Sequence, residues 1–147
     1  MISQTSSSEN QIRSFSTAIS ATNDEIQHLF DFDDVFAVLL FRLDGRVLNS
    51  LYNTGFSNSV LPVIKWIKNI ISKTKEELKR GAKSIKYHKN LDEKKAIPVY
   101  FYKAGNSSIM VAILNQTANT GLMEIEMSRT AARLGIIIDT KKALGDY

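Results

Sequence analysis

The chain has 147 residues, carries a formal net charge of +4 and contains no cysteine. Its length is that of one domain, and 44% apolar residues are enough for a hydrophobic core. The lack of cysteine excludes disulfides and thiolate metal sites, and no run of about 20 apolar residues predicts a membrane span. The N-terminal residues lack the apolar core of a signal peptide, so we expect a cytoplasmic protein, and the Lys/Ile-rich composition is typical of a prokaryotic or archaeal source.

The N-terminal third predicts a polar segment followed by a helix. Residues 1–10 are rich in Ser, Gln and Asn, which indicates a flexible N-terminal segment. Apolar residues then recur at helical spacing from about residue 10 to residue 30, with a candidate break at Thr22, which has capping-box spacing to Glu25. The acidic cluster Asp31, Asp33 and Asp34 follows, either as a solvated loop or as a weak cation site.

A hairpin comes next. Residues 35–43, VFAVLLFRL, are apolar on both alternating faces, as expected for a central strand that is covered on both sides. Asp44-Gly45 suits a two-residue type I′ turn, and residues 46–52 form the return strand. We therefore assign Asp44 a structural role.

The segment 59–80 predicts a long helix with two apolar stripes. Pro62 lies in its first turn, where a missing N–H costs little. The first stripe suits packing on a sheet and consists of Val60, Ile64, Ile67, Ile71 and Leu78. The second consists of Val63, Trp66 and Ile70. It packs either under a loop or helix of the same chain or against another subunit, with Trp66 as a buried anchor.

The remaining segments predict three strands and a last helix. Gly81 ends the long helix, and residues 82–90 alternate as a half-exposed strand. Residues 96–103 form another strand, in which Pro98 favours an edge or a bulge. Residues 108–115 form an apolar central strand. Residues 120–134 form a helix that Gly135 can end, residues 136–138 form a candidate short extension, and residues 139–147 form a polar tail.

This order, α-β-β-α-β-β-β-α, predicts one α/β (α+β) sandwich domain over residues 11–138. It would contain a five-stranded antiparallel sheet, with the long helix on one face and the N- and C-terminal helices on the other. The chain has no phosphate-binding loop and no G-x-G-x-x-G, and His28 and His88 are far apart. We expect no catalytic, cofactor-binding or metal site, no small-molecule substrate and no enzymatic activity.

Basic residues concentrate between Lys65 and Lys89. A patch of four of them would bind an acidic protein, an anionic lipid or a nucleic acid: Lys73, Lys75, Lys79 and Arg80. A solvated helix face followed by a lysine-guarded edge strand explains the same residues. We do not expect nucleic acid, because only Trp66 and Tyr87 offer aromatic platforms nearby, and we expect membrane association to be peripheral or through a partner.

Two segments resemble the roadblock family of dynein light-chain-like proteins. FAVLLFRLDGRVLNS is similar to that family's first hairpin, and ILNQTANTGLMEIEMSRTAARL is similar to its last strand and closing helix. The resemblance covers about residues 10–135. The long polar N-terminal segment and the basic region 73–89 depart from the family pattern.

The resemblance implies a homodimer with aligned long helices and middle strands paired into a ten-stranded sheet. On this chain the interface would consist of Val63, Trp66, Ile70, Lys83, Ile85 and Tyr87. It also implies a scaffold or regulator of small Ras-like GTPases, or a part of motor or membrane-tethering complexes. A longin-like trafficking adaptor stays open as an alternative, although a longin begins with strands and this chain is predicted to begin with a helix.

Overall fold

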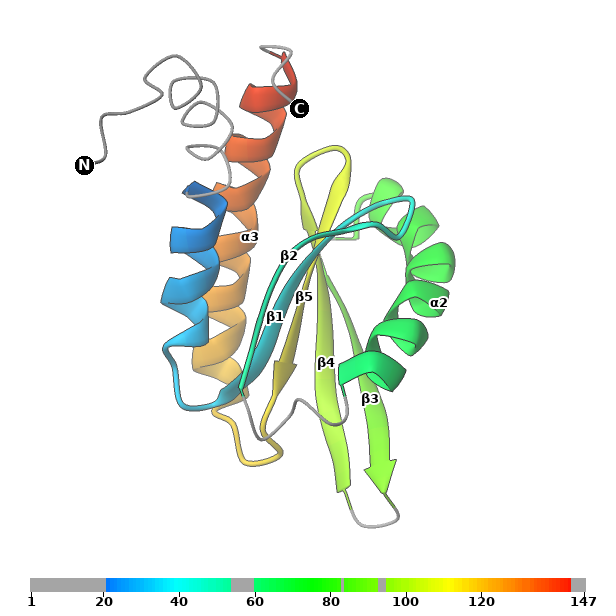
Figure 1. Ribbon diagram of the computed structural model, residues 1–147, viewed down its shortest axis with the longest axis vertical. Coiled ribbons are helices and arrows are strands. Elements are labelled where there is room, and N and C mark those ends of the chain that lie inside the picture. The colour runs from blue at the N-terminus through cyan, green and yellow to red at the C-terminus, as the bar shows by residue number, and fades with distance from the viewer. Residues whose placement is uncertain (1–20, 54–59, 83, 93–94, 144–147) are drawn as a thin grey trace, which may run out of the picture.

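The computed structural model describes residues 21–53, 60–82, 84–92 and 95–143, and shows the predicted order of elements (Figure 1). Residues 21–30 are helical and precede the first strand. The other elements are β1 (Val35–Arg42), β2 (Val47–Tyr52), α2 (Val60–Lys79), β3 (Ser84–Asp92), β4 (Lys95–Ala104), β5 (Ser108–Leu114) and α3 (Thr120–Ala143). None of the helices in these ranges carries an apolar stretch long enough to cross a bilayer.

The five strands form one antiparallel sheet in the order β2-β1-β5-β4-β3. The apolar strands β1 and β5 pair at its centre, and every residue of β5 is buried. The two edges are β2, which belongs to the first hairpin, and β3, which follows α2. Both central strands are apolar throughout because a strand covered on both faces has no side that meets water.

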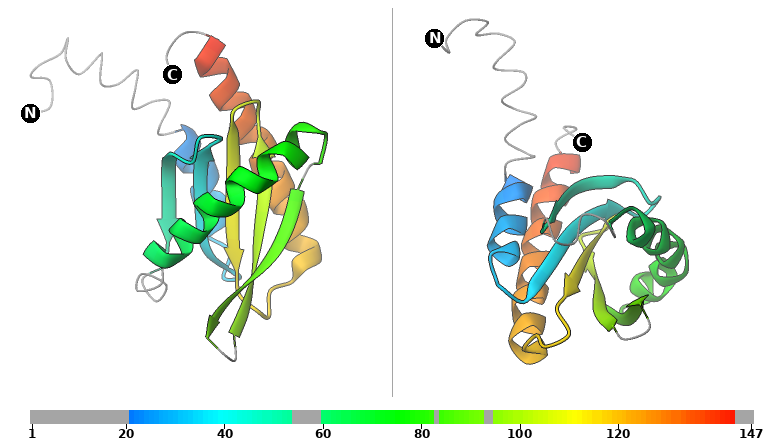
Figure 2. Two further views of the ribbon diagram at one scale, coloured as in Figure 1. Left: turned by 90° about the vertical axis from the view of Figure 1, so that its right-hand side faces the viewer. Right: turned by 60° about the horizontal axis from the view of Figure 1, so that its bottom comes forward.

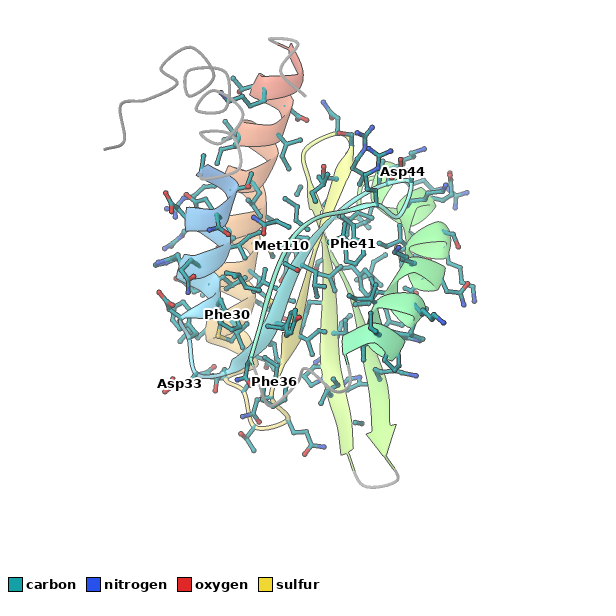
Figure 3. The ribbon with its side chains drawn as sticks, viewed as in Figure 1. Phe30, Asp33, Phe36, Phe41, Asp44 and Met110 are labelled. Atoms are coloured by element: carbon teal, nitrogen blue, oxygen red, sulfur yellow. The ribbon has the colours of Figure 1, made fainter. Side chains whose placement is uncertain are left out.

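Helices cover the sheet on both faces, so the predicted fold class is confirmed (Figure 2). Alternate residues of β1 point to opposite sides: Leu39 and Phe41 pack with α2, whereas Val38 and Leu40 pack with the N-terminal helix and α3. Figure 3 shows Phe41 on the α2 side of the sheet. This alternation creates two separate hydrophobic cores with the sheet between them.

The first hairpin is confirmed, but its loop is longer than the two-residue turn that we predicted. The loop spans residues 43–46: the Arg42 N–H donates to the Arg46 carbonyl at 2.8 Å, and the Gly45 N–H donates to the Arg42 carbonyl at 2.9 Å. Gly45 has a φ of 92°, a conformation that other residues rarely adopt. A register shift between Leu40 and Phe41 accompanies the longer loop.

Helix α3 does not end at Gly135, contrary to our prediction, and continues to Ala143. A Cβ at position 135 would lie 2.4 Å from the Gly105 backbone nitrogen, in the turn between β4 and β5. Glycine is therefore required by a close approach of helix and turn and not by the end of a helix. The Asn106 N–H donates to both carboxylate oxygens of Asp139, at 3.2 and 3.3 Å, and residues 139–143 of the predicted polar tail belong to α3.

Pro98 lies in β4, which is an inner strand and not the predicted edge. The pairing of β4 with β5 begins at Val99, so among the described strands β3 alone pairs with β4 at Pro98. The missing N–H is therefore tolerated at a position that is locally an edge.

Some predictions concern residues that lie outside the described part of the chain. These residues are the segment 1–10, the helical positions before residue 21, Lys83 and residues 144–147.

Candidate protein interface

Strand β3 leaves one side of the sheet open. It pairs with β4 over the whole of its length and, among the described elements, has no strand on its other side (Figure 1). An edge strand of this kind presents a row of backbone N–H and C=O groups that can pair with another chain. Its nine residues make it one of the two longest strands in the sheet, so the open row is long.

An aromatic cluster lies beside this edge, between α2 and β3. The ring of Trp66 on α2 packs edge-on against Tyr87 on β3 at 6.1 Å and against Phe101 on β4 at 6.3 Å, and Tyr87 lies 5.5 Å from Phe101. Phe101 is fully buried, whereas Trp66 and Tyr87 keep part of their surface exposed. We call Trp66, Ile85 and Tyr87 the β3 flank, since all three are half-buried on this side of the molecule.

Two residues of the predicted interface belong to the core of the single chain. Val63 is 1% exposed and Ile70 is 8% exposed, and both pack with Ile67 and Ile71 against the sheet. The two apolar stripes that we distinguished in the sequence of α2 form the two sides of one wide face of this helix, and that face packs on the sheet. Of the two alternatives left open for the second stripe, packing within the same chain therefore holds for Val63 and Ile70, whereas Trp66 stays half-exposed. The interface itself remains a prediction.

The four residues of the predicted basic patch do not form one surface. Positions 73 and 75 are two residues apart on α2, which places them about 200° apart around the helix. Lys75 lines a cleft beside the loop between β1 and β2, and the Lys79 ammonium lies 4.0 Å from a Glu76 carboxylate oxygen. Lys73 and Arg80 are exposed at other angles.

The structure brings Lys75 of the predicted patch together with two other cations, Arg46 and Lys68, around that cleft. We did not predict this set because Arg46 lies on the hairpin and is separated in sequence from α2. The only signal in the sequence is the spacing of Lys68 and Lys75, which are seven residues apart and therefore share a helix face.

Three of the side chains considered as ligands, Asp31, Asp34 and His28, have structural contacts. An Asp34 carboxylate oxygen accepts the Asn119 N–H at 3.1 Å next to the start of α3, and Asp31 accepts the Gln27 amide at 2.8 Å. His28 lies 3.7 Å from Glu126 on α3. Within the described ranges, no three His, Asp or Glu side chains gather as metal ligands would.

Comparison with known families gives one match that covers most of the chain. Residues 19–128 match the model of a family described as AF0774-like protein. A comparison with curated protein sequences gave no match.

Solved structures share the fold at low sequence identity. The gliding protein MglB from Thermus thermophilus is 14% identical, with a TM-score of 0.62 over 84% of this chain and 92% of that chain. Myxococcus xanthus MglB is 13% identical, with a TM-score of 0.66 over 82% and 90%. MglC from Myxococcus xanthus is 13% identical, with a TM-score of 0.61 over 79% and 98%. The roadblock-like fold indicated by the sequence resemblance is thus confirmed.

Proposed function

The chain belongs to the AF0774-like family, and from this premise and its roadblock-like fold we propose that it is a homodimeric, non-enzymatic cytoplasmic scaffold that binds a small Ras-like GTPase. The observation that carries the proposal is the open edge of β3 beside the half-exposed rings of Trp66 and Tyr87. The helical residues 21–30, which precede β1, agree with the roadblock resemblance better than with a longin, which begins with strands.

The lysines of β3 do not block its edge. The Lys86 ammonium lies 5.3 Å above the Tyr100 ring, and the Lys89 ammonium lies 5.5 Å from the Trp66 ring. Tyr100 and Trp66 pack on opposite faces of the sheet, so these two charges fold back over the faces. Lysines that guard an edge instead keep their charge where an incoming strand would lie. Neither Lys86 nor Lys89 therefore covers the backbone row of β3.

A symmetric dimer would pair the free backbone groups of this edge with those of a second β3 strand. Two β3 strands that run antiparallel about a two-fold axis would join their sheets and bring the β3 flanks of two α2 helices together. Trp66 would then exchange its remaining exposed surface for contact with the partner. Large aromatic side chains at the centre of an interface commonly contribute more than about 2 kcal/mol to binding.

The dimer is tested with light scattering on two variants of one helix. The protomer mass is 16.5 kDa, and we expect the wild type to give about twice this value. Trp66→Glu should shift the equilibrium toward the protomer. Leu61→Glu is the control, because Leu61 is 71% exposed on the same helix and lies away from the β3 flank. A wild type that stays at 16.5 kDa at high concentration contradicts the dimer, and circular dichroism verifies that both variants fold.

The GTPase partner is tested separately by affinity capture. The immobilised chain is mixed with purified small GTPases of the same organism, each loaded with GDP or with a non-hydrolysable GTP analogue. A scaffold for this switch should prefer one nucleotide state, because the two states differ in the loops that partners contact. Equal and negligible retention of every GTPase in both states contradicts the proposed partner and leaves the dimer result unaffected.

A further inference from the structure

A cleft lies on the side of α2 that faces away from β3. It opens between α2 and the loop that joins β1 to β2, and has a volume of about 540 Å³. This is within the range of small-ligand sites. We call it the hairpin cleft, and its lining residues are Leu43, Asp44, Gly45, Arg46, Lys68, Ile71, Ser72 and Lys75. Because the hairpin and β3 occupy opposite edges of the sheet, the cleft is remote from the proposed dimer interface.

The loop that forms one wall of the cleft is held by its own hydrogen bonds. The Gly45 N–H and the Arg42 N–H close the loop backbone, and the Arg46 N–H donates to an Asp44 carboxylate oxygen at 3.0 Å. A Cβ on Gly45 would lie 3.9 Å from the Lys68 Cγ, an ordinary van der Waals distance, so the loop lies beside the stem of this lysine. The wall is therefore pre-organised, which lowers the entropy cost of binding.

Positive charge dominates the cleft. Among the described lining residues, Arg46, Lys68 and Lys75 contribute three cations, and Asp44 contributes the single carboxylate. The Arg46 backbone N–H and the guanidinium of Arg42 hold the pKa of Asp44 below its usual value, so its carboxylate is ionised at neutral pH. No carboxylate among the described residues lies within 4 Å of the Lys68 or Lys75 ammonium. Both lysines are thus available to an anion.

The remaining lining groups narrow the kind of anion. Leu43 and the buried Ile71 provide an apolar floor, and the Ser72 hydroxyl, which donates to the Asn69 carbonyl at 2.7 Å, offers only acceptor lone pairs. Asp44 is likewise an acceptor that repels bare anions but takes hydrogen bonds from hydroxyl groups. Lysine and arginine are common ligands of phosphate. A ligand that carries both a phosphate and hydroxyl groups would match donors and acceptors together.

We propose that the hairpin cleft binds a phosphorylated sugar or polyol, with the phosphate on Arg46, Lys68 and Lys75 and a hydroxyl group on Asp44. The same chemistry occurs in soluble sugar phosphates and in the headgroups of phosphoinositide lipids. This inference does not depend on the dimer or on a GTPase, because every contact comes from one chain.

The test is a titration of the isotopically labelled full chain, followed by nuclear magnetic resonance and calorimetry. The probes are inorganic pyrophosphate, inositol trisphosphate and unphosphorylated inositol. We expect shifts centred on Gly45, Arg46 and Ser72 with the two phosphates and none with inositol. Lys68→Gln and Lys75→Gln should each weaken binding about tenfold, the usual effect of losing one charge-assisted hydrogen bond. Lys65→Gln is the matched control, because Lys65 is exposed on the same helix and does not line the cleft.

Asp44→Asn tests the hydroxyl contact. The amide oxygen can still accept the Arg46 N–H, so the loop should keep its shape. Loss of the negative charge should strengthen pyrophosphate binding, and the preference for inositol trisphosphate over pyrophosphate should fall. An increase of the same size for both ligands overturns the hydroxyl contact on which the ligand class rests.

Vesicles distinguish the two sources of the ligand. Cosedimentation with phosphoinositide vesicles that is lost in Lys68→Gln supports a lipid headgroup, whereas binding of inositol trisphosphate without vesicle binding supports a soluble compound. Retention on phosphatidylserine vesicles of equal charge, with Lys65→Gln and Lys68→Gln equally weakened, overturns the proposal in favour of diffuse electrostatics. The absence of binding to every phosphate probe overturns it as well.

Discussion

The two flanks of helix α2 face opposite edges of one sheet and differ in chemistry. On the β3 flank, Trp66 packs with Tyr87 beside a strand whose backbone is unpaired on its outer side. On the other flank, Lys68 and Lys75 meet Arg46 across the hairpin cleft. Both flanks share the same helix and the same core, so their difference comes from what each edge of the sheet presents. Rings beside open backbone suit a protein surface, and a cationic cleft suits a small anion.

Phe101→Ala should give the largest effect and should damage the β3 flank first. Phe101 is fully buried and contacts the rings of both Trp66 and Tyr87. Removal of such a side chain costs about 3–5 kcal/mol of unfolding free energy, which urea denaturation measures. In the folded fraction, dimerisation should weaken while pyrophosphate binding to the hairpin cleft persists.

Phe36→Ala is the matched control for this substitution. Phe36 is only partly buried at the rim of the same core, so its loss should cost clearly less than that of Phe101. If folded Phe101→Ala lost dimerisation and pyrophosphate binding to the same extent, the β3 flank and the hairpin cleft would not be independent.

Gly135→Ala tests whether a general loss of stability affects the β3 flank and the hairpin cleft equally, since both depend on the same sheet. A Cβ at this position would collide with the backbone of Gly105, on the face opposite to α2. Overpacking of this kind costs about 1–3 kcal/mol, and thermal denaturation should show it with no preference between the flanks. In contrast, Gly121→Ala in the first turn of α3 meets only the Asn119 side chain at 3.7 Å and should be neutral or stabilise by about 0.5–1 kcal/mol. Similar destabilisation by both substitutions would contradict the contact argument.

Gly135 also shows where prediction from sequence fails. The order of elements and the fold class could be predicted, because helical and strand periodicities are local and each is read within one segment. A glycine in a helix, however, predicts an end of the helix unless one knows that Gly105, thirty residues earlier, passes beside it. Contacts of this kind depend on how α3 lies over the sheet, and no local pattern encodes that.

The candidate sites likewise contain features that local sequence patterns predict and features that depend on the folded arrangement. The open strand and Trp66 could be predicted, because alternation and apolar spacing lie within β3 and α2. The burial of Val63 and Ile70 could not, since the width of a buried helix face depends on the shape of the sheet beneath it. The cleft was missed for a related reason: the hairpin brings Arg46 to Lys68 and Lys75 only after folding.

Gly45→Ala should affect the hairpin cleft and leave the β3 flank unchanged. Gly45 has a φ of 92°, so an alanine there is strained by about 1–2 kcal/mol although its Cβ has room. We expect a loss of stability of this size and weaker pyrophosphate binding, because relief of the strain moves the loop. Gly81→Ala is the matched control, with a φ of 111° and no atom within 4 Å of its Cβ, at the end of α2. Gly81→Ala should lower the free energy of unfolding by a similar amount without weakening pyrophosphate binding to the cleft. Equal weakening of pyrophosphate binding by both substitutions would contradict a local effect of Gly45.

The smallest effect is a pH dependence that also separates the flanks. The pKa of Asp44 is lowered in the folded chain, mainly by the hydrogen bond from the Arg46 backbone N–H. The stability that this carboxylate contributes is therefore present above its ordinary value of 3.8 and is lost as the pH falls through the lower, folded pKa. Protonation also removes the negative charge of the cleft.

Sulfate is the suitable probe for this step, because it keeps its second negative charge to a much lower pH than phosphate does. The affinity of sulfate for the cleft should rise as the pH falls below 3.8, the ordinary pKa of this carboxylate. A protonated Asp44 no longer repels the sulfate that binds to Arg46, Lys68 and Lys75. Asp44→Asn should bind sulfate at neutral pH as the wild type does in acid, and it should lose the pH dependence. The dimer mass, which depends on the other flank, should not follow the titration of Asp44. A sulfate affinity that rises equally in wild type and Asp44→Asn would locate the titrating group outside the cleft and remove Asp44 from the ligand's surroundings.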